Sequence, residues 1–492
     1  MVQVDDAVDV VVVGGGNAGF SAALAAAERG REVLLLEKGA PGESGGNSYY
    51  TAGAFRIAHG GLDGDDGVAD LLDDDERLAT TTLPPYPREA FTADMVKVTG
   101  GRCDPDLTRV LVEDSQDALR WLHGHGLRFR LMYERQAYPD AQGRHVFWGG
   151  LAVGSTGGGK GLVQQHTAAA RAAGVRVRHG ARGRRLLVED GRVTGVEFSG
   201  DTGDAVVRAE SVVLAAGGFE ADARARREHL GDGWERAKVR GTALNTGDML
   251  DAALAAGAAR GGDWTSCHSV AWDARPGNES DRELTNQLTR GGYPLGIVVN
   301  RAGERFVDEG ADFRNYTYAR YGAEILRQPD GLAFQVFDAT TRPMLRREEY
   351  DAPGTSVHVA DTLAELAAAA GIDPAGLERT VAGFNAAVRT DVPFDAAVKD
   401  GRSAAVSPPK SNWALELRTP PFYAFPVTCG ITFTFGGLRA DTSARVLDGA
   451  GRPLPGLFVC GEMLGGLFSG NYPGGTGLTS GAVFGRRAGS MA

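Results

Sequence analysis

The chain has 492 residues, enough for about three domains of average size or for one large fold with an insertion. Its 52 basic and 63 acidic residues give a net charge of −11, which excludes general nucleic-acid binding, and no apolar run is long enough to span a membrane. The acidic N-terminus is unlike a signal peptide, and the four cysteines form no CxxC pair. We therefore expect a cytoplasmic protein without a metal site.

The N-terminal residues predict a strand, a helix and a second strand. The apolar run Val8–Val13, interrupted only by Asp9, has the composition of a buried strand. It leads into three glycines, and a helix-forming stretch over 22–29 and another apolar strand over 33–36 follow. Glycine makes up 71 of the 492 residues, about twice its usual share, which indicates that backbone approaches other groups closely at many places.

The next part of the chain alternates helix and strand patterns. The acid-rich segment 61–76 is expected to be a solvated loop, and apolar spacing predicts helices over 106–124 and 162–173. Further strands are expected within 175–198 and over 212–218, where the second again ends on glycine. This alternation is typical of an α/β protein, α+β overall.

The glycine motifs lie at both ends of the chain, whereas the middle is more polar and aromatic. This distribution predicts a Rossmann-like dinucleotide-binding domain built from residues 1–262 and 429–492. A substrate-binding cap domain, residues 263–428, would be inserted between the two parts.

The most specific motif is Gly14-x-Gly16-x-x-Gly19, between the first strand and the first helix. The first glycine permits a tight turn, the second lets a pyrophosphate contact backbone, and the third lets helix and strand pack closely. The helix N-terminus then offers N–H groups to the phosphates, and Glu37, after the second strand, can accept hydrogen bonds from ribose hydroxyls. The unit predicts dinucleotide binding.

A second glycine-rich segment, 154–161 (GSTGGGKG), nearly matches a phosphate-binding P-loop. Gly161 stands where that motif needs a hydroxyl for Mg²⁺, and the segment is distant in sequence from the N-terminal unit. We expect no ATP site there.

Three further segments resemble elements of flavoproteins: they read Glu43-Ser44-Gly45-Gly46-Asn47-Ser48, Asn245-Thr246-Gly247-Asp248 and Val459-Cys460-Gly461-Glu462. Together with the N-terminal unit, they resemble the fumarate reductase/succinate dehydrogenase flavoprotein superfamily over nearly the whole chain. The resemblance implies FAD, bound non-covalently because Asn47 stands where succinate dehydrogenases have the histidine that attaches the flavin. The residues that it places at FAD are Gly14, Gly15, Gly16, Ala18, Gly19, Glu37, Lys38, Gly46, Asn47, Ser48, Thr51, Ala52, Gly53, Ala216, Gly217, Asp248, Glu462, Gly475, Gly477 and Leu478.

Three long segments narrow the resemblance: 303–318 (GERFVDEGADFRNYTY), 427–437 (VTCGITFTFGG) and 471–481 (NYPGGTGLTSG). In these segments the chain is most similar to bacterial tricarballylate dehydrogenases. The resemblance implies that Arg314 transfers a proton and that His268 binds substrate. Arg290 and Arg314 are the best candidates to hold carboxylates, because arginine pairs with them through charge-assisted hydrogen bonds.

Two groups of fumarate reductases are missing: Phe433 replaces a histidine, and Tyr472 replaces the C-terminal substrate arginine. A true fumarate reductase is therefore not expected. Tyr472 also resembles a tyrosine of 3-ketosteroid dehydrogenases that helps to bind the substrate carbonyl, and Tyr316 or Tyr318 could supply a phenolic base. The candidate catalytic set is Arg314, His268, Tyr472, Arg290, Tyr316 and Tyr318.

The resulting hypothesis is an FAD-dependent oxidoreductase that introduces a C=C bond α,β to the carboxylate of a small, tricarballylate-like acid. A base would remove the α-proton while flavin N5 takes hydride from the β-carbon. The electrons would leave to a separate acceptor, which is a partner protein, a quinone or oxygen. Three alternatives stay open: an enoate reductase, a 3-ketosteroid-type dehydrogenase and a flavin-dependent isomerase without net redox change.

Overall fold

The computed structural model describes residues 3–4, 7–140, 142–200, 203–275, 277 and 280–492. The chain forms two compact units: unit 1 spans 1–231, 241–267 and 433–492, and unit 2 spans 232–240 and 268–432. The expected boundaries, after residues 262 and 428, lie five and four residues before the transitions between the units at 267/268 and 432/433. The short segment 232–240, which the sequence assigned to the dinucleotide-binding domain, belongs to unit 2.

The central sheet of unit 1 is built from the apolar strands predicted at the N-terminus. Strand β2 (Val8–Val13) and strand β3 (Val33–Leu36) pair in parallel, and helix α1 (Asn17–Glu28) connects them. The predicted strand–helix–strand unit is thereby confirmed. The parallel strands lie in the order β10-β3-β2-β13-β21. The three strands not yet introduced are β10 (Arg176–Arg178), β13 (Gly203–Leu214) and β21 (Pro453–Val459).

Strand β13 is long enough to pair in two ways. Its first half pairs antiparallel with β12 (Arg192–Gly200), which pairs with β11 (Arg182–Glu189), and its second half lies between β2 and β21. Strand β20 (Arg445–Leu447) extends the sheet beyond β21, and β1 (Gln3–Val4) pairs with β13. Both chain ends therefore contribute to one sheet.

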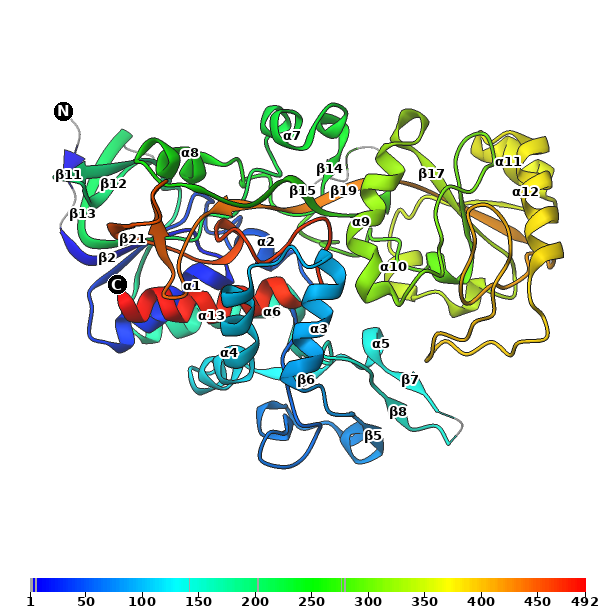
Figure 1. Cartoon of the computed structure of the whole chain (residues 1–492), viewed down its shortest axis with the longest axis horizontal. Coiled ribbons are helices and arrows are strands. Elements are labelled where there is room, and N and C mark those ends of the chain that lie inside the picture. The colour runs from blue at the N-terminus through cyan, green and yellow to red at the C-terminus, as the bar shows by residue number, and fades with distance from the viewer. Residues whose placement is uncertain (1–2, 5–6, 141, 201–202, 276, 278–279) are drawn as a thin grey trace. The chain divides into compact units, whose positions relative to one another are not determined.

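Helix α13 (Thr476–Met491) packs along α1, as Figure 1 shows for the red and blue helices. Three glycines spaced four residues apart, Gly481, Gly485 and Gly489, lie on one face of α13. A Cβ on Gly485 would lie 2.5 Å from the main-chain oxygen of Ala18, and one on Gly489 would lie 2.0 Å from that of Ala22. Side chains at these positions would force the two helices apart.

The remaining elements of unit 1 surround this sheet. Helix α4 (Pro105–Gly124) confirms the helix predicted over 106–124 and is capped by the Asp104 carboxylate. Helix α6 (Gly158–Ala172) begins four residues before the predicted start at 162, because the glycines before Leu162 adopt helical turns. The other elements are α2 (Gly46–Tyr49), β4 (Ala54–Phe55), β5 (Thr81–Thr82), α3 (Arg88–Thr99), β6 (Phe129–Leu131), α5 (Tyr133–Gln136), β7 (Tyr138–Pro139), β8 (His145–Val146), β9 (Val153–Ser155), α7 (Ala223–Leu230) and α8 (Asp248–Ala255).

Unit 2 has its own sheet, in the order β14-β19-β17-β16, with β15 and β18 also pairing with β19. The strands are β14 (Lys238–Val239), β15 (Arg260–Asp273), β16 (Ile297–Val299), β17 (Ala333–Phe337), β18 (His358–Ala360) and β19 (Phe422–Leu438). Strands β15 and β19 both run from one unit into the other.

Helices cover both faces of the unit 2 sheet because its strands alternate. Phe334 and Val336 of β17 pack in the core under α11 (Leu363–Ala370) and α12 (Pro374–Ala387). Ala333 packs on the opposite face with Tyr321 and Ile325 of α9 (Arg314–Leu326). The short helix α10 (Arg347–Tyr350) adds Tyr350 to a third cluster.

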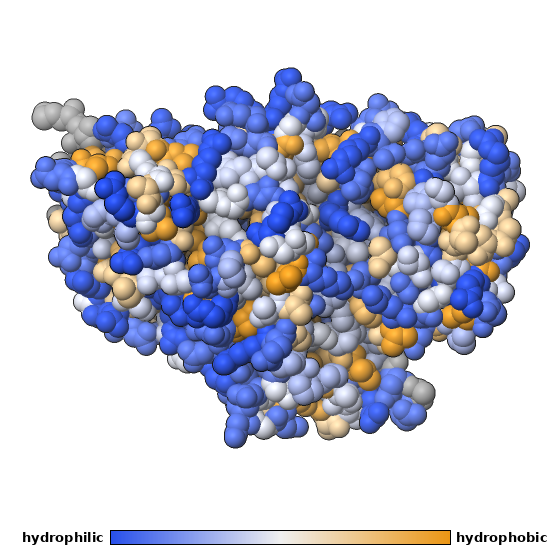
Figure 2. Space-filling model, in the orientation of Figure 1, coloured by the Kyte–Doolittle hydropathy of each residue, from blue (hydrophilic) through white to orange (hydrophobic). Residues whose placement is uncertain are grey.

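The surface is predominantly polar, with hydrophobic residues scattered over the face shown in Figure 2. The exposed large hydrophobic side chains belong to distant parts of the chain, for example Val96, Val188 and Met344. Among the described residues, no helix combines the length and the apolar character needed to cross a membrane.

Candidate active site

The start of α1 in unit 1 has the geometry of a phosphate-binding turn. Gly14 has a φ of +111°, and a Cβ on it would lie 2.2 Å from the Ala215 oxygen. A Cβ on Gly19 would lie 1.8 Å from the Gly14 oxygen. Gly16 is the N-cap of α1 and carries no side chain that could occupy the helix N-terminus. A pyrophosphate group fits this turn, because backbone N–H groups and the helix dipole favour anions there.

Glu37 is held at this turn by two backbone donors. The Gly15 N–H donates to its Oε2 and the Gly39 N–H to its Oε1, both at 2.7 Å. Burial raises the pKa of Glu37, although these two hydrogen bonds act in the opposite direction. The fixed carboxylate is placed to accept hydrogen bonds from a ribose, as the sequence predicts.

Residues 46–53 lie against the same helix terminus. The Ser48 hydroxyl accepts a hydrogen bond from the Asn17 N–H at 2.9 Å. Thr51 donates to the Ser48 carbonyl at 2.9 Å and accepts from the Gly53 N–H at 3.0 Å, and Ala52 lies within this turn. Gly53 has a φ of +76° and lies against Gly158 at the start of α6. The internal bonds hold this segment in one conformation.

Lys38 and Asp248 were predicted to bind FAD, and the structure joins them in an ion pair of 2.8 Å. Asp248 also accepts hydrogen bonds from Arg182, and Lys38 donates to the Leu244 carbonyl and the Thr246 hydroxyl. Burial alone would raise the pKa of Asp248, but the bonds from Arg182 and Lys38 lower it. These contacts tie segment 244–248 to the end of β3.

The strand end at Ala216 and Gly217 meets the C-terminal Gly-Glu motif. The Ala216 N–H donates to Met463 Sδ at 3.1 Å, and a Cβ on Gly217 would lie 2.3 Å from the Asn245 amide nitrogen. Glu462 Oε1 accepts the Thr434 N–H at 2.8 Å. All of the residues predicted to bind FAD lie in unit 1.

Asn47 is fixed through both of its amide atoms. Its Nδ2 donates to Glu220 at 2.7 Å, and its Oδ1 accepts the Thr242 N–H at 2.9 Å. The side chain is an amide without nucleophilic chemistry, which agrees with the expectation of non-covalent FAD.

The C-terminal glycines belong to the start of α13. Gly475 is the N-cap of this helix with a φ of +85°, and Gly477 and Leu478 lie in its first turn. The Leu478 carbonyl accepts from the Asn17 amide at 2.8 Å, and Asn17 Oδ1 contacts His166 Nε2 at 2.9 Å. Asn17 thus connects α1, α6 and α13, a role that the sequence analysis missed although the residue lies within the glycine motif.

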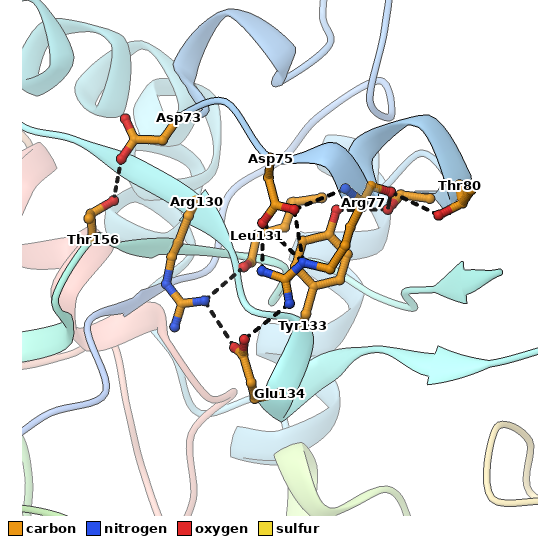
Figure 3. Close-up of polar contacts among 10 residues, drawn as sticks. Asp73, Asp75, Arg77, Thr80, Arg130, Leu131, Tyr133, Glu134 and Thr156 are labelled. Carbon is orange, nitrogen blue, oxygen red and sulfur yellow. Dashed lines mark hydrogen bonds and ion pairs between the residues drawn. The ribbon is translucent and has the colours of Figure 1, made fainter. Parts of the chain in front are cut away.

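The near-P-loop segment is engaged in internal contacts. The Thr156 hydroxyl donates to Asp73 at 2.7 Å (Figure 3). A carboxylate in this position disfavours a bound phosphate. Figure 3 also shows the neighbouring network, in which Asp75 pairs with Arg77 at 2.5 Å and Arg77 contacts Glu134 at 3.2 Å. Segment 61–76 is largely exposed, as expected of a solvated loop, and Arg120 and Arg128 pair with its Asp70 and Asp73 at 3.1 and 2.5 Å.

Tyr472 lies in an apolar cluster of unit 1. Its ring contacts those of Phe433 and Phe468 edge-on, with centroids 5.2 and 5.4 Å apart, and Phe435 contacts Phe433 at 5.3 Å. The aromatic rings of Phe433 and Tyr472 therefore occupy the two positions that the sequence comparison assigns to a histidine and an arginine in fumarate reductases.

The Asp263 carboxylate fixes residues 469–470, which precede Tyr472 of this cluster. Asp263 Oδ2 accepts from the Ser469 hydroxyl at 2.6 Å and the Ser266 hydroxyl at 2.5 Å, and Ser266 accepts the Gly470 N–H at 2.9 Å. Burial alone would raise the pKa of Asp263, but the hydroxyl hydrogen bonds outweigh it and lower the pKa to about 2.

The depressed pKa predicts acid sensitivity. Asp263 contributes stability that is complete above its ordinary value of 3.8 and is lost as the pH falls through about 2. We expect the free energy of unfolding of Asp263→Asn to be lower than that of the wild type by about 2 kcal/mol at neutral pH. Urea unfolding from neutral pH to about pH 2 measures both curves. They should converge in acid, and a constant gap between them would contradict this assignment.

Unit 2 holds Arg314 at the first residue of α9. Its Nη1 donates to Glu349 Oε1 at 3.1 Å, and the same oxygen lies 3.4 Å from Arg346 Nη1. Glu349 is buried and also accepts the Gly291 N–H at 3.1 Å. Arg314 keeps 18% of its side chain accessible. The side chain is thus partly accessible, and its guanidinium is fixed by Glu349, a carboxylate from another segment that the sequence did not predict.

The residues before Arg314 are also fixed. Arg305 and Glu309 form a buried ion pair of 2.5 Å, and Glu309 accepts the Val298 N–H at 2.8 Å. Asp308 accepts the N–H groups of Gly310 and Ser411. The long motif over 303–318 therefore anchors the entry into α9.

His268 of β15 lies edge-on to the ring of Tyr318, with centroids 5.0 Å apart. Burial, together with the charge of Arg240, holds the pKa of His268 well below its usual range, so its imidazole is neutral at neutral pH. Because α9 is helical, Tyr318 shares the face of Arg314 four residues earlier, whereas Tyr316 points elsewhere. The structure thus separates the two tyrosines that the sequence treated as a pair.

Arg290 is fully buried and has internal partners. Its Nη2 donates to Asp273 Oδ2 at 2.5 Å, and its Nη1 donates to the main-chain oxygens of Gln287 and Glu349. Asp273 also accepts from Ser356. These contacts support a structural role for Arg290 in place of the substrate contact expected from the sequence.

Removing one partner of this buried pair should be costly. We expect Arg290→Gln to lower the free energy of unfolding by about 3–5 kcal/mol, because Asp273 is left buried without its cation. Equilibrium urea unfolding measures the change. The matched control, Arg389→Gln, breaks an exposed pair with Asp391 in the same unit and should leave the midpoint nearly unchanged. Equal shifts in both variants would refute the structural role.

The chain matches the family described as "FAD binding domain" over residues 9–478. It is 30% identical to a probable fumarate reductase of Shewanella frigidimarina, over 98% of this chain and 74% of that protein. It is 29% identical to the 4-oxocyclohexanecarboxylate 2-dehydrogenase of Sinomonas cyclohexanicum, over 95% and 89%. The open conformation of a flavocytochrome c3 fumarate reductase superposes with a TM-score of 0.72 at 28% identity, covering 99% of this chain and 78% of that one.

Proposed function

Because this chain belongs to the FAD-binding-domain family, within the fumarate reductase/succinate dehydrogenase superfamily, and is an FAD-dependent oxidoreductase acting on CH–CH groups, we propose that it dehydrogenates the bond α,β to a carboxylate. The observation that carries the proposal is the partly accessible Arg314 side chain at a helix start, whose guanidinium the buried Glu349 fixes. When bound, FAD supplies the acceptor for hydride from the β-carbon.

Arg314 is the proposed base for the α-proton. A free guanidinium is a very weak acid, so this role needs surroundings that favour the neutral form. Arg314 begins a 13-residue helix, where the dipole disfavours a cation. The ion pair with Glu349 favours the charged form, and Arg346 shares that carboxylate. Glu349 is in turn the group that can take the proton from Arg314.

Of the other candidates in unit 2, His268 is proposed to polarise the substrate and Tyr318 to orient His268. The neutral imidazole of His268 can donate a hydrogen bond to a developing enolate oxygen without adding charge. Tyr318 orients this ring through their edge-on contact. Tyr316, on another face of α9, is assigned to packing, and Arg290 to positioning Glu349 through the latter's main-chain oxygen.

The substrate that the contacts favour carries a carboxylate and an apolar part. A tricarballylate-like acid, which the resemblance suggests, needs a cation for each of several carboxylates. Arg290 is paired internally, and Phe433 and Tyr472, whose rings contact each other, replace the histidine and the substrate arginine of fumarate reductases. The similarity to a dehydrogenase named for 4-oxocyclohexanecarboxylate supports a cyclic acid or ketone as the first substrate class to test.

The test is the flavin absorbance of the anaerobic enzyme after mixing with acids. We expect 4-oxocyclohexanecarboxylate or a related cyclic acid to bleach the oxidised band, and tricarballylate to bleach it more slowly or not at all. If no acid bleaches the flavin and a 3-ketosteroid does, the substrate is a ketone and not a carboxylate. That result would favour the 3-ketosteroid-type dehydrogenase, in which Tyr472 helps to bind the substrate carbonyl. If chemically reduced enzyme is reoxidised by unsaturated acids while no saturated acid bleaches it, the enzyme is an enoate reductase.

An isomerase would convert its substrate without any added electron acceptor, and proton NMR of the anaerobic mixture tests for that product.

For the dehydrogenase, the proposal includes a cytoplasmic location and a separate electron acceptor. Reoxidation rates of the reduced enzyme with oxygen, a quinone and a carrier protein compare the candidates.

A further inference from the structure

Two glutamates of unit 1 meet beside the cofactor-binding segments. Glu220, just after β13, and Glu462, just after β21, bring one carboxyl oxygen each to the same side of Gly218. Gly218 makes this approach possible, because a Cβ there would lie 2.2 Å from Glu462 Oε1 and 2.8 Å from Glu220 Oε2. Two carboxyl groups can share a hydrogen bond only when one of them carries a proton.

The surrounding donors distinguish the two carboxyls. Glu220 Oε1 accepts hydrogen bonds from the amides of Asn47 at 2.7 Å and Asn245 at 2.6 Å. Two such donors stabilise an ionised carboxylate. Its other oxygen, Oε2, is buried, and no N–H or hydroxyl group of the described residues donates to it. The protonated carboxyl of Glu462 can donate an O–H hydrogen bond to this oxygen.

Glu462 accepts longer hydrogen bonds than Glu220 does. Both come from Thr434, whose N–H donates to Oε1 at 2.8 Å and whose hydroxyl donates to the same oxygen at 3.2 Å. Arg226 donates to the main-chain oxygen of Glu220. Burial and then the charge of Glu220 raise the pKa of Glu462 well above its ordinary value.

We propose that Glu220 and Glu462 form an acid pair that shares one proton, in which ionised Glu220 is a positioning residue that keeps Glu462 protonated. The pair then brings one negative charge, not two, to the FAD-binding unit. Protonated Glu462 can also act as a hydrogen-bond donor there, whereas the resemblance implied only that Glu462 lies at FAD. The inference does not depend on which substrate the enzyme uses.

Infrared spectroscopy of the holoenzyme, titrated with alkali in H₂O and D₂O, tests the shared proton. We expect the wild type to show the C=O stretch of a protonated carboxyl that persists above neutral pH. Glu462→Gln should lose this band, because Glu220 keeps two amide donors and gains a third. Glu220→Gln should keep it only to a lower pH than the wild type, since the neighbouring negative charge is gone. The exposed control Glu210→Gln should retain the wild-type titration.

Three infrared outcomes would overturn the proposal. Absence of the band in the wild type means that both groups are ionised. Survival of the band in Glu462→Gln places the proton on Glu220. An unchanged titration in Glu220→Gln means that Glu462 is protonated independently. If a variant releases FAD, the same spectra of its apoprotein and of wild-type apoprotein give the answer.

The flavin midpoint potential gives an independent readout of the charge. With a shared proton, Glu462→Gln leaves one negative charge in place, so its potential at neutral pH should stay near that of the wild type. The double variant Glu220→Gln/Glu462→Gln removes that charge and should raise the potential, because reduced flavin gains negative charge. A rise of similar size already in Glu462→Gln alone would show two ionised carboxylates and refute the proposal.

Discussion

Replacing Arg314 with alanine should lower turnover by about 100- to 10,000-fold, the range for loss of a positioned general base. The FAD content should not change, because every residue predicted to bind FAD lies in unit 1 and Arg314 lies in unit 2. Folding should also persist, since Glu349 keeps Arg346 and the Gly291 N–H as partners. Steady-state kinetics with the acid that bleaches the flavin, together with the flavin-to-protein absorbance ratio, measure both effects.

Two comparisons make this result specific. Added guanidinium should partly restore the turnover of Arg314→Ala, because it supplies the missing group to the space left beside Glu349. The control Arg327→Ala, just after the same helix and 67% exposed, should turn over like the wild type. If Arg314→Ala keeps turnover within about tenfold of the wild type, the base is another group. Tyr318, on the same face of α9, would then be tested next.

Replacing Gly19 with alanine should release FAD and lower the free energy of unfolding by about 1–3 kcal/mol, the usual cost of overpacking. The reason is geometric: the new Cβ would lie 1.8 Å from the Gly14 oxygen, so α1 must move away from the turn that follows β2. The N–H groups at the start of α1 then lose their position relative to the phosphates. The flavin-to-protein ratio after gel filtration and the thermal unfolding midpoint measure the two effects.

Gly124→Ala is the matched control. Gly124 is the last residue of α4 in the same unit, and nothing lies within 4 Å of a Cβ built on it. This variant should keep its flavin and its unfolding midpoint. Full FAD occupancy in Gly19→Ala would show that the close approach of helix and turn is not needed for binding.

The parts of the fold that the sequence predicted well are those set by local pattern. Strands β2 and β3 are continuous apolar runs, and α4 has regular apolar spacing with Asp104 as a capping residue. The start of α6 was placed too late, because glycine is a poor indicator of a helix and tertiary contacts with residues 51–53 stabilise that first turn. The placement of 232–240 in unit 2 depends on pairing between β14 and β19, about 190 residues later in the chain.

The same distinction holds for the candidate site. The glycines of the turn after β2 could be predicted, because their spacing follows from the backbone path of a single strand–helix unit. Glu349 could not, since it lies in no motif and meets Arg314 only through the fold of unit 2. Arg290 was assigned to substrate because arginine binds carboxylates, but Asp273 supplies that carboxylate from within the protein. Sequence identifies a residue's chemistry, whereas its partner is decided by distant segments.

The packing of α13 on α1 has a consequence for biosynthesis. Residues 476–491 are translated more than 400 residues after α1, and the helix pair cannot form before they leave the ribosome. At about 5–20 residues per second, the N-terminal turn waits on the order of half a minute or longer for its last neighbour. Residues 268–432 are translated in that interval and can fold first. Flavin capture is therefore a late event, and nascent chains arrested before residue 476 should carry no FAD.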